Sequence, residues 1–411
     1  MKKTTLRKYA KLVALKGVNV QKGQDVVINA GLDQPEFVTM VAEECYKAGA
    51  RSVDIRWSYQ PAQKNSLRYK NLKTLSEVDE MELARWKFMA EKLPCLIFID
   101  SDDPDGMSGL SKKVMGKLAK SQQARYPVIK PYRDAMENKY QWTIVAVPGE
   151  KWAKKLFPGM RTSQAMEKLW QAILDTCRVW DDPVAEWDAH NADLKARSAY
   201  LNSLGVEKLH YHSDKSGTEF TVGMIPQGQF CGGSEDTLSG VTFNPNMPTE
   251  ECFISPMKGD AEGIVYATKP LCYEGQLIEN FSIRFEGGKA VEWHAEKNEE
   301  LLTKLITMDE GSCYLGECAL VPFSSPINES GILFYNTLFD ENAVCHLALG
   351  MGFPDTIKGF EEMSLEEVRA RGVNDSMVHE DFMIGSEDLC IDAICRDGRT
   401  VPVFRGGTWA F

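Results

Sequence analysis

The chain has 411 residues, of which 43% are hydrophobic and 26% are charged, as in an ordinary soluble globular protein. Its formal net charge is -12 and no basic stripe stands out, which argues against a nucleic-acid partner, because phosphate binding relies on clustered lysine and arginine. No apolar run approaches the ~18 residues needed to span a bilayer. Residues 1–20 also lack the uninterrupted apolar core of a signal peptide. We therefore expect neither a nucleic acid nor a membrane as a partner.

The eleven cysteines are an odd number, scattered along the chain, and they include no C-x-x-C pair. Several of them, such as Cys95 and Cys345, lie in short apolar runs. This pattern is typical of reduced thiols that act as small hydrophobic side chains, and it fits a disulfide framework or a structural zinc site poorly. It predicts a cytoplasmic protein.

A chain of this length exceeds the size at which one hydrophobic core usually stops growing, so two domains are expected. Residues 24–57 have the pattern strand, helix, strand, which predicts a βαβ unit with a parallel strand pair. Helical and strand patterns then alternate to residue 147, without a glycine-rich phosphate-binding motif. We expect an N-terminal α/β domain over residues 1–180. The elements expected here are a helix at 4–17, strands at 26–30, 52–57, 95–100 and 142–147, and helices from Asp33, at 76–92 and at 111–124.

Residues 149–204 have helical spacing, and from residue 210 onward short strands and glycine turns dominate. The expected strands are 220–224, 263–268, 281–286 and 289–294, with one helix at 297–308. We therefore expect residues 181–411 to form a β-rich, mixed α+β domain, and the whole protein to be of the α/β class.

Two of the six histidines lie in an acidic region between residues 316 and 385. In an extended strand alternate side chains point to the same face, so His379 and Asp381 would direct an imidazole and a carboxylate into one cavity. His346 lies in the apolar run 343–349, which is typical of a buried strand, and a buried imidazole needs a partner. Glu341 precedes that run.

Spacing alone leaves simpler interpretations open. A single histidine in an apolar strand is more often a hydrogen-bonded core residue than a metal ligand, and Glu317, beside a glycine, is more often a turn residue. The pair Glu250 and Glu251 lies between prolines and an apolar triplet, where a solvated acidic loop is the simpler reading. A metal site and a purely structural role both remain possible at this point.

Four segments together carry a more specific signal. They are N-M-P-T-E-E at 246–251, L-G-E-C-A-L-V-P at 315–322, D-E-N-A-V-C-H-L-A-L-G at 340–350 and N-D-S-M-V-H-E-D-F-M-I-G at 374–385. In this order they resemble the successive motifs of the aminopeptidase T family, cytosolic two-metal aminopeptidases that include the PepS-type enzymes. The resemblance covers nearly the whole chain. It implies a homodimeric metalloaminopeptidase that releases N-terminal residues from short peptides, with the catalytic metal site in the C-terminal domain.

Carried over residue by residue, the resemblance implies two divalent metal ions and six ligands: Glu251, Glu317, Glu341, His346, His379 and Asp381. Glu251 is preferred to Glu250 because it directly precedes the apolar part of its motif. Four carboxylates would offset the +4 charge of two ions, and a mixed nitrogen and oxygen set suits zinc, cobalt or manganese. Two ions ~4 Å apart would activate a bridging water and polarise the scissile carbonyl.

The chain departs from the family at one position. Members usually have a tyrosine before the proline that follows H-L-A-L-G, whereas this chain has Phe353, which cannot donate a hydrogen bond. Two alternatives therefore stand beside the aminopeptidase: a metal-dependent hydrolase of another small amide, and a catalytically weak metal-binding relative. The sequence assigns no residue as the proton shuttle.

Overall fold

The computed structural model describes residues 1–411, which form two compact units. The first unit consists of Met1–His190 and Ser234–Pro248, and the second of Asn191–Gly233 and Thr249–Phe411. The division passes through α9 (Pro183–Ser203). The expected combination of an α/β part and a β-rich part is confirmed, while the domain boundary at residue 180 stays a prediction.

The first unit is built on a four-stranded parallel sheet with the order β2-β1-β3-β4. The strands are β1 (Asp25–Gly31), β2 (Ser52–Ser58), β3 (Cys95–Asp100) and β4 (Trp142–Ala146). The βαβ unit expected at residues 24–57 is confirmed, because β1 and β2 pair in parallel and the helix between them, α2 (Pro35–Ala48), packs against both.

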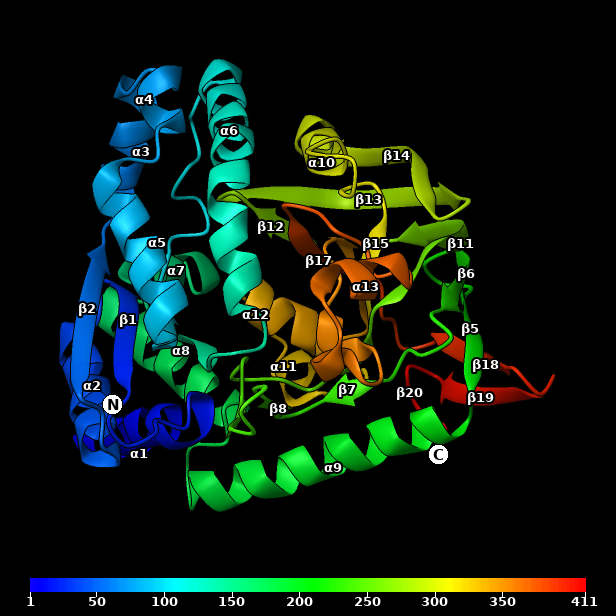
Figure 1. The fold of residues 1–411 in the computed structure, drawn as a ribbon, viewed down its shortest axis with the longest axis horizontal. Coiled ribbons are helices and arrows are strands. Elements are labelled where there is room, and N and C mark those ends of the chain that lie inside the picture. The colour runs from blue at the N-terminus through cyan, green and yellow to red at the C-terminus, as the bar shows by residue number, and fades with distance from the viewer. The chain divides into compact units, whose positions relative to one another are not determined.

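Helices cover both faces of this sheet. On one side Phe37 of α2 joins Tyr9 of α1 (Lys3–Leu12) and Trp170 of α8 (Thr162–Thr176), with ring centroids 5.2 and 5.6 Å away. On the other side α5 (Glu80–Lys92) and α6 (Lys112–Met136) contribute the buried Met89 and Met136. Figure 1 shows α5 and α6 side by side. The remaining elements of this unit are η1 (Val13–Gly17), α3 (Gln60–Tyr69), α4 (Leu72–Ser76), α7 (Glu150–Leu156), β8 (Glu235–Asp236) and β9 (Thr242–Phe243).

Helix α6 is longer than the sequence suggests, because it continues past residue 124 and contains Pro127 and Pro131. A proline removes one helical hydrogen bond and normally ends or bends a helix. Here the buried Met136 near the end of α6 packs against Val27 and Leu96 of the sheet, so tertiary packing holds the last turns in place.

The second unit contains two antiparallel sheets. The larger has nine strands in the order β12-β13-β11-β6-β5-β18-β19-β20, with β14 paired to β13, and the smaller has the order β17-β16-β15-β10-β7. The larger sheet consists of β5 (Val206–Ser213), β6 (Thr218–Met224), β11 (Pro256–Tyr266), β12 (Leu271–Tyr273), β13 (Gln276–Glu286), β14 (Lys289–Lys297), β18 (Cys390–Cys395), β19 (Thr400–Arg405) and β20 (Thr408–Trp409).

The smaller sheet consists of β7 (Cys231–Gly232), β10 (Cys252–Ile254), β15 (Leu315–Leu320), β16 (His346–Gly350) and β17 (His379–Met383). The helices of the unit, besides part of α9, are α10 (Glu299–Ile306), α11 (Pro326–Glu329), α12 (Thr337–Asp340), η2 (Glu341–Ala343), η3 (Pro354–Thr356), η4 (Phe360–Glu362) and α13 (Leu365–Ala370).

One apolar core joins the two sheets of the second unit. Leu347 and Leu349 of β16 and Phe382 of β17 belong to it, together with Phe220 and Phe281 from the larger sheet. Because side chains alternate along a strand, the residues between these core positions point to the opposite face of the smaller sheet. That opposite face carries the candidate site.

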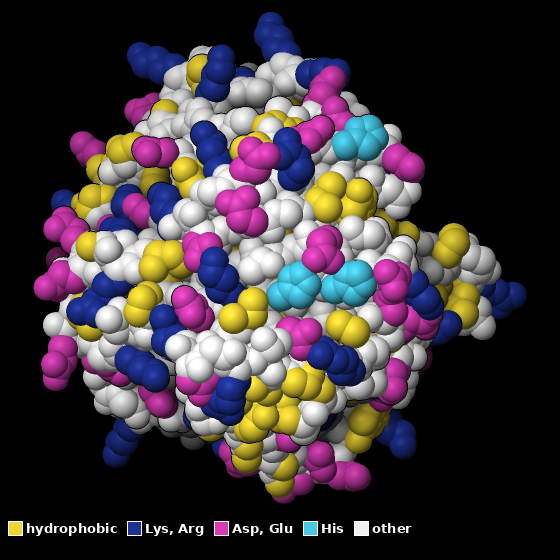
Figure 2. All heavy atoms as spheres, turned by 90° about the vertical axis from the view of Figure 1, so that its right-hand side faces the viewer, with side chains coloured by type: hydrophobic (Ala, Val, Ile, Leu, Met, Phe, Trp, Pro, Cys, Tyr) yellow, Lys and Arg dark blue, Asp and Glu magenta, His cyan; other side chains and the backbone are white.

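All eleven cysteines are free thiols, and seven of them are buried, as the sequence pattern predicts. No helix has the length and apolar character required to cross a membrane. On the face shown in Figure 2, acidic and basic side chains are interspersed and no continuous basic patch is visible.

The packing of Phe382 gives a test of this arrangement. Its side chain is 1% exposed and its ring lies 5.9 Å from that of Phe281. We expect Phe382→Ala to lower the free energy of unfolding by about 3–5 kcal/mol, because it removes buried apolar surface and leaves a cavity. Urea denaturation followed by circular dichroism measures the loss, and Phe382→Leu should cost clearly less. A loss below about 1 kcal/mol for the alanine variant would contradict the shared core.

Candidate metal centre

The pairing of β15, β16 and β17 places ionisable side chains on one face of the smaller sheet. Ala348 of β16 lies opposite Glu317 on one side and opposite Asp381 on the other. In the neighbouring rows His346 pairs with Ala319, and His379 pairs with Gly350. Directly paired residues point to the same face, so the small residues leave open space above the sheet between the acidic and imidazole groups.

A β-bulge at Gly316 brings Glu317 onto this face. Leu315 pairs with Leu349 on the core side, and the register then shifts so that Glu317 pairs with Ala348. A side chain at Gly316 would not fit, because its Cβ would lie 2.1 Å from the carbonyl oxygen of Met351. The bulge therefore re-aims one carboxylate that a regular strand would have pointed into the core.

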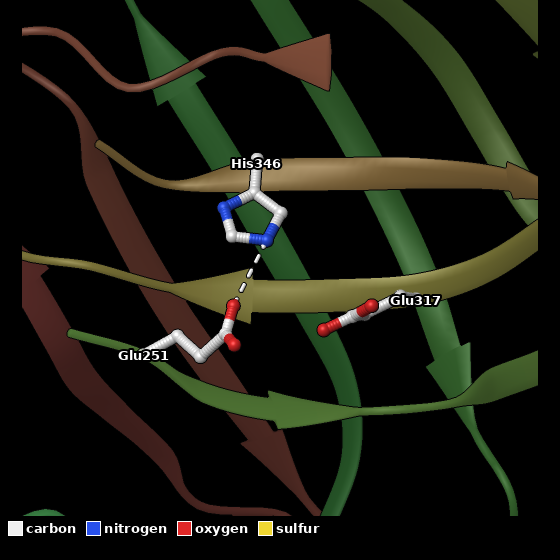
Figure 3. A group of neighbouring side chains, drawn as sticks. All are labelled: Glu251, Glu317 and His346. Carbon is white, nitrogen blue, oxygen red and sulfur yellow. Dashed lines mark ion pairs between the residues drawn. The ribbon is translucent and has the colours of Figure 1, made fainter. Parts of the chain in front are cut away.

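The donor atoms form two groups that share one residue. Glu251, Glu317 and His346 make up the first, and Glu317, His379 and Asp381 make up the second, with the donor atoms of each group within 4.8 Å of one another. His346 Nε2 lies 3.1 Å from Glu251 Oε2, and His379 Nε2 lies 3.1 Å from Glu317 Oε2. Figure 3 shows Glu251, Glu317 and His346 pointing toward one another. All five side chains except the partly exposed His379 are buried.

Glu341 lies next to these groups but belongs to neither. It is the first residue of η2 and is buried. The charge of Asp381 acts on its carboxyl group, and its Oε1 accepts a hydrogen bond of 3.2 Å from the Asn342 amide. The structure therefore places Glu341 beside the second group, one contact away from the shared centre.

Both histidines are oriented by their backbone contacts. His346 Nδ1 lies 2.8 Å from the carbonyl oxygen of Glu341, and His379 Nδ1 lies 2.7 Å from that of Met351. A carbonyl oxygen only accepts hydrogen bonds, so each Nδ1 carries the proton and donates it. Each Nε2 is then directed at the carboxylates, which is the arrangement that metal-ligating histidines usually have.

The carboxyl groups repel one another in this buried space. Burial raises the pKa of Glu317 to about 7, and the charges of Asp381 and Glu251 add to this increase. Burial also raises the pKa of Glu341 well above its usual value, again with a contribution from Asp381 and Glu251. The side chains of the protein alone therefore hold more negative charge here than the surroundings readily accept.

The imidazoles compensate part of that charge. Burial alone would lower the pKa of His346, but its hydrogen bond to Glu251 and the nearby carboxylates outweigh burial and raise its pKa to about 9. Burial would also lower the pKa of His379, but Asp381 and Glu317 outweigh burial and raise it well above its usual value. Burial would likewise raise the pKa of Asp381, yet the positive charge of His379 outweighs burial and lowers it. The cluster thus has a strong electrostatic demand for positive charge.

The residues fit a divalent cation. Asp381 Oδ1 is a buried oxygen that accepts no hydrogen bond, and it lies 3.5 Å from His379 Nε2 and 3.8 Å from His346 Nε2. Buried polar atoms without a partner are rare, and a cation would provide one. Carboxylate oxygens with neutral imidazole nitrogens are a typical ligand set for first-row divalent ions.

Several residues that support the site do not stand out in the sequence. Asn342 is fully buried and joins two of the acidic segments, because its side chain accepts the Glu250 N–H at 2.8 Å and donates to Glu341. Thr249 donates a hydrogen bond of 3.3 Å to Glu251. Asn342 was not singled out from the sequence, and its position directly after Glu341 is the one sequence signal that could have indicated it.

Phe353 lies at the edge of the second group. Its ring centroid is 4.7 Å from that of His379 and 5.8 Å from that of Phe253. Its backbone is fixed on both sides, since its N–H donates to Ser255 Oγ at 2.8 Å and its carbonyl accepts from Thr356 Oγ1 at 2.6 Å. The position singled out in the sequence thus contacts a candidate ligand directly.

Known proteins match the chain over its whole length. The family described as thermophilic metalloprotease (M29) matches residues 2–409. Aminopeptidase AmpS of Bacillus subtilis (strain 168) is 41% identical over 408 residues, which cover 99% of this chain and 98% of that protein. Aminopeptidase T of Thermus aquaticus is 39% identical over 411 residues and covers 98% of each chain.

A solved structure, wild-type AmpT from Thermus thermophilus, has a TM-score of 0.87 to this chain at 36% identity, and the match covers 100% of both chains. This agreement extends the sequence match to the fold. The match of the family over residues 2–409 and these relatives show that the chain belongs to the M29 family of metalloproteases.

Proposed function

We propose that the protein is a metal-dependent aminopeptidase that releases N-terminal residues from short peptides and uses two divalent metal ions. The observation that carries this proposal is the pair of donor groups that share Glu317 on one face of a sheet. The aminopeptidase names of its relatives support the reaction. All the proposed ligands lie within residues 181–411, which supports assigning the catalytic domain to that part of the chain.

In the proposed site Glu317, which belongs to both donor groups, would contribute to holding both ions. Glu251 and His346 complete the first ion site, and His379 and Asp381 complete the second. Glu341 is the sixth ligand, and it would reach the second ion beside Asp381. Four carboxylates balance two divalent ions, and zinc, cobalt or manganese suits the oxygen and nitrogen donors.

When bound, the ions would supply Lewis acidity and lower the pKa of a coordinated water to near neutrality. The chain's own residues hold the geometry for that chemistry. The carbonyl groups of Glu341 and Met351 fix the two imidazoles, and Thr249 and Asn342 fix two of the carboxylates. Because these donors are buried, few waters compete for their orientation.

We also propose that the enzyme is a cytoplasmic homodimer. Eleven free cysteines, seven of them buried, suit a reducing compartment. The dimer rests on the family resemblance.

A second candidate, a catalytically weak metal-binding relative, is favoured by one observation. Phe353, which packs on His379, offers no hydroxyl at the edge of the site. If a donor there stabilises developing negative charge, its loss costs on the order of 10²- to 10³-fold in rate. A hydrolase that acts on another small amide would share the same site.

Hydrolysis of a peptide panel tests the proposed reaction. The panel pairs dipeptides that have a free amine with the same dipeptides after acetylation, on protein stripped of metal and then refilled with zinc, cobalt or manganese. We expect cleavage of the free-amine peptides alone, and only after metal is restored. Metal uptake without cleavage of either kind would favour the weak relative, and cleavage of blocked peptides would exclude an aminopeptidase.

The neighbouring glutamates provide a matched pair for the ligand assignment. Glu251→Gln should lower metal affinity by more than roughly tenfold, because it removes a charged donor beside His346. Glu250→Gln should leave affinity nearly unchanged, since both variants alter charge equally and only one removes a proposed ligand. Isothermal titration with zinc compares the affinities of the two variants. Equal losses of affinity would contradict the assignment of Glu251, rather than Glu250, as the ligand.

The open space above Ala348 is a steric requirement of the proposed site. Ala348→Leu should reduce bound metal strongly, because the added atoms point between Glu317 and Asp381. Ala348→Gly should retain the metal, and circular dichroism should show both variants folded. Metal content by mass spectrometry provides the measurement, and a leucine variant with full metal content would place the ions elsewhere.

The role of Phe353 is tested by restoring the hydroxyl. Phe353→Tyr should raise kcat on the preferred dipeptide by at least roughly tenfold if a missing donor limits the rate. Phe360→Tyr, on η4, is the control for adding a phenol elsewhere. An unchanged kcat in Phe353→Tyr would show that another group already performs this task.

A further inference from the structure

The first unit contains a cavity of about 650 Å³ that is unrelated to the metal centre. It lies between the face of the parallel sheet and helices α5 and α6, and its lining comes entirely from the first unit. The lining residues are Asn29, Arg56, Asp79, Met81, Glu82, Arg85, Trp86, Met89, Leu96, Phe98, Arg133, Met136, Glu137 and Tyr140. This volume is in the range of sites that bind small molecules.

The floor of the cavity is one row of the sheet. Asn29 of the central strand β1 pairs with Arg56 of β2 and with Phe98 of β3, so the three side chains lie next to one another on the same face. Phe98 is 37% exposed, although its neighbours Ile97 and Ile99 are buried. A large aromatic ring in the middle of a sheet normally packs under a helix, so the helices leave this row uncovered.

Asn29 adds a polar group to this floor. Its side chain makes no hydrogen bond within the protein, although it occupies the central strand of the unit, where the flanking Ile28 and Ala30 are buried. A strand position that faces covering helices is usually apolar. A polar amide there, open to a cavity, is the kind of departure from a consistent core that marks a functional position.

The inner wall is apolar. Met89 and Met136 pack with Leu96 and Val27 at the amino-terminal ends of the strands, and Trp86 packs against them. Aromatic and methionine side chains offer broad contact surface to an apolar group. The cavity thus has an apolar inner part next to the polar row.

The guanidinium groups at the cavity have N–H donors that are not used within the protein, whereas the carboxylates there already interact with other protein groups. Arg85 and Arg133 form no ion pair, and the Arg85 guanidinium contacts only the sulfur of Met81, at 3.7 Å. Asp79 accepts the Glu82 N–H at 2.8 Å and thereby caps α5.

Two further ion pairs bear on the balance of charge. Glu82 pairs with Arg125, which is not part of the lining. Arg56 pairs with the exposed Asp54 at 3.0 Å, and its own guanidinium remains at the floor. The side-chain charge that remains available to a ligand in the cavity is therefore positive.

We propose that this cavity binds a small molecule that carries one carboxylate on an aromatic or aliphatic body. Guanidinium groups bind carboxylates through paired, charge-assisted hydrogen bonds, and the Asn29 amide can donate a further one. The apolar part of the ligand would lie on Phe98, Trp86 and the methionines. A single negative charge fits better than a phosphate dianion, because three acidic residues also line the cavity.

Binding of a blocked amino acid tests the proposal. The probe is N-acetyl-phenylalanine, whose blocked amine removes the feature that an aminopeptidase recognises, and the comparison is its uncharged amide. Isothermal titration of the full-length, metal-loaded protein should show one site for the acid, with the amide at least roughly tenfold weaker because a hydrogen bond to a charged group is lost. Failure of the acid to bind at millimolar concentration, or equal binding of both compounds, would overturn the proposal.

Charge reversal then locates the site. Arg85→Glu and Arg133→Glu should each weaken binding of the acid at least roughly tenfold. Arg161→Glu should leave binding unchanged, because this arginine is also exposed but lies outside the lining. Glu317→Gln, which alters the metal centre, should also retain binding. Binding that survives both lining variants, or that disappears in Glu317→Gln, would place the probe elsewhere and refute the assignment.

Discussion

The structure of the second unit depends on one constraint: acidic side chains are buried together on one face of a small sheet. Burial and mutual repulsion raise the pKa values of Glu317 and Glu341, and two imidazoles provide positive charge within the cluster. A buried charge without a partner is costly, so such a cluster persists only where cations or protons compensate it. The buried Oδ1 of Asp381 accepts no hydrogen bond, which indicates that a cation is its missing partner. The cluster is therefore best understood as a cation-binding site, and the bound cations would determine its chemistry.

The rest of the unit positions this cluster. The opposite face of the same three strands is part of the apolar core, and Leu347, Leu349 and Phe382 anchor it there. With that face fixed, the alternation of side chains directs His346, His379 and Asp381 to the opposite face. In β15, regular alternation would have directed the Glu317 carboxylate into the core. The bulge at Gly316 directs it to the face of the site instead. Small residues between the ligands keep the space above the sheet open. Core packing thus supplies the rigidity that the site needs.

Much of the fold could be predicted from the sequence. The βαβ unit at residues 24–57 and the buried strand in the apolar run 343–349 were predictable, because apolar periodicity is a local signal. The length of α6 was not, because packing of Met136 outweighs two prolines that locally favour an end. Residues 234–248 belong to the first unit, which they join through contacts such as the hydrogen bond of 2.7 Å from Ile144 N to Pro245 O. No local sequence pattern indicates that the chain returns to the first unit there.

The site likewise has residues that the local sequence pattern predicted and residues that it could not predict. Strand alternation predicted that His379 and Asp381 share a face, and their donor atoms lie 3.5 Å apart. The inclusion of Glu251 and Glu317 rested on the family resemblance, since a glutamate beside a glycine, or one of an acidic pair in a loop, carries no local signal of its partners. Neither the bulge nor the bridging Asn342 could be read from residue types, because both depend on which strands become neighbours.

Anomalous diffraction from crystals of the zinc-loaded protein would show whether the acidic cluster binds two metal ions. We expect two ion peaks in the second unit, one among Glu251, Glu317 and His346 and the other among Glu317, His379 and Asp381, with Glu317 contacting both. A single peak, or peaks that do not involve Glu317, would contradict the two-ion centre and the mechanism built on it.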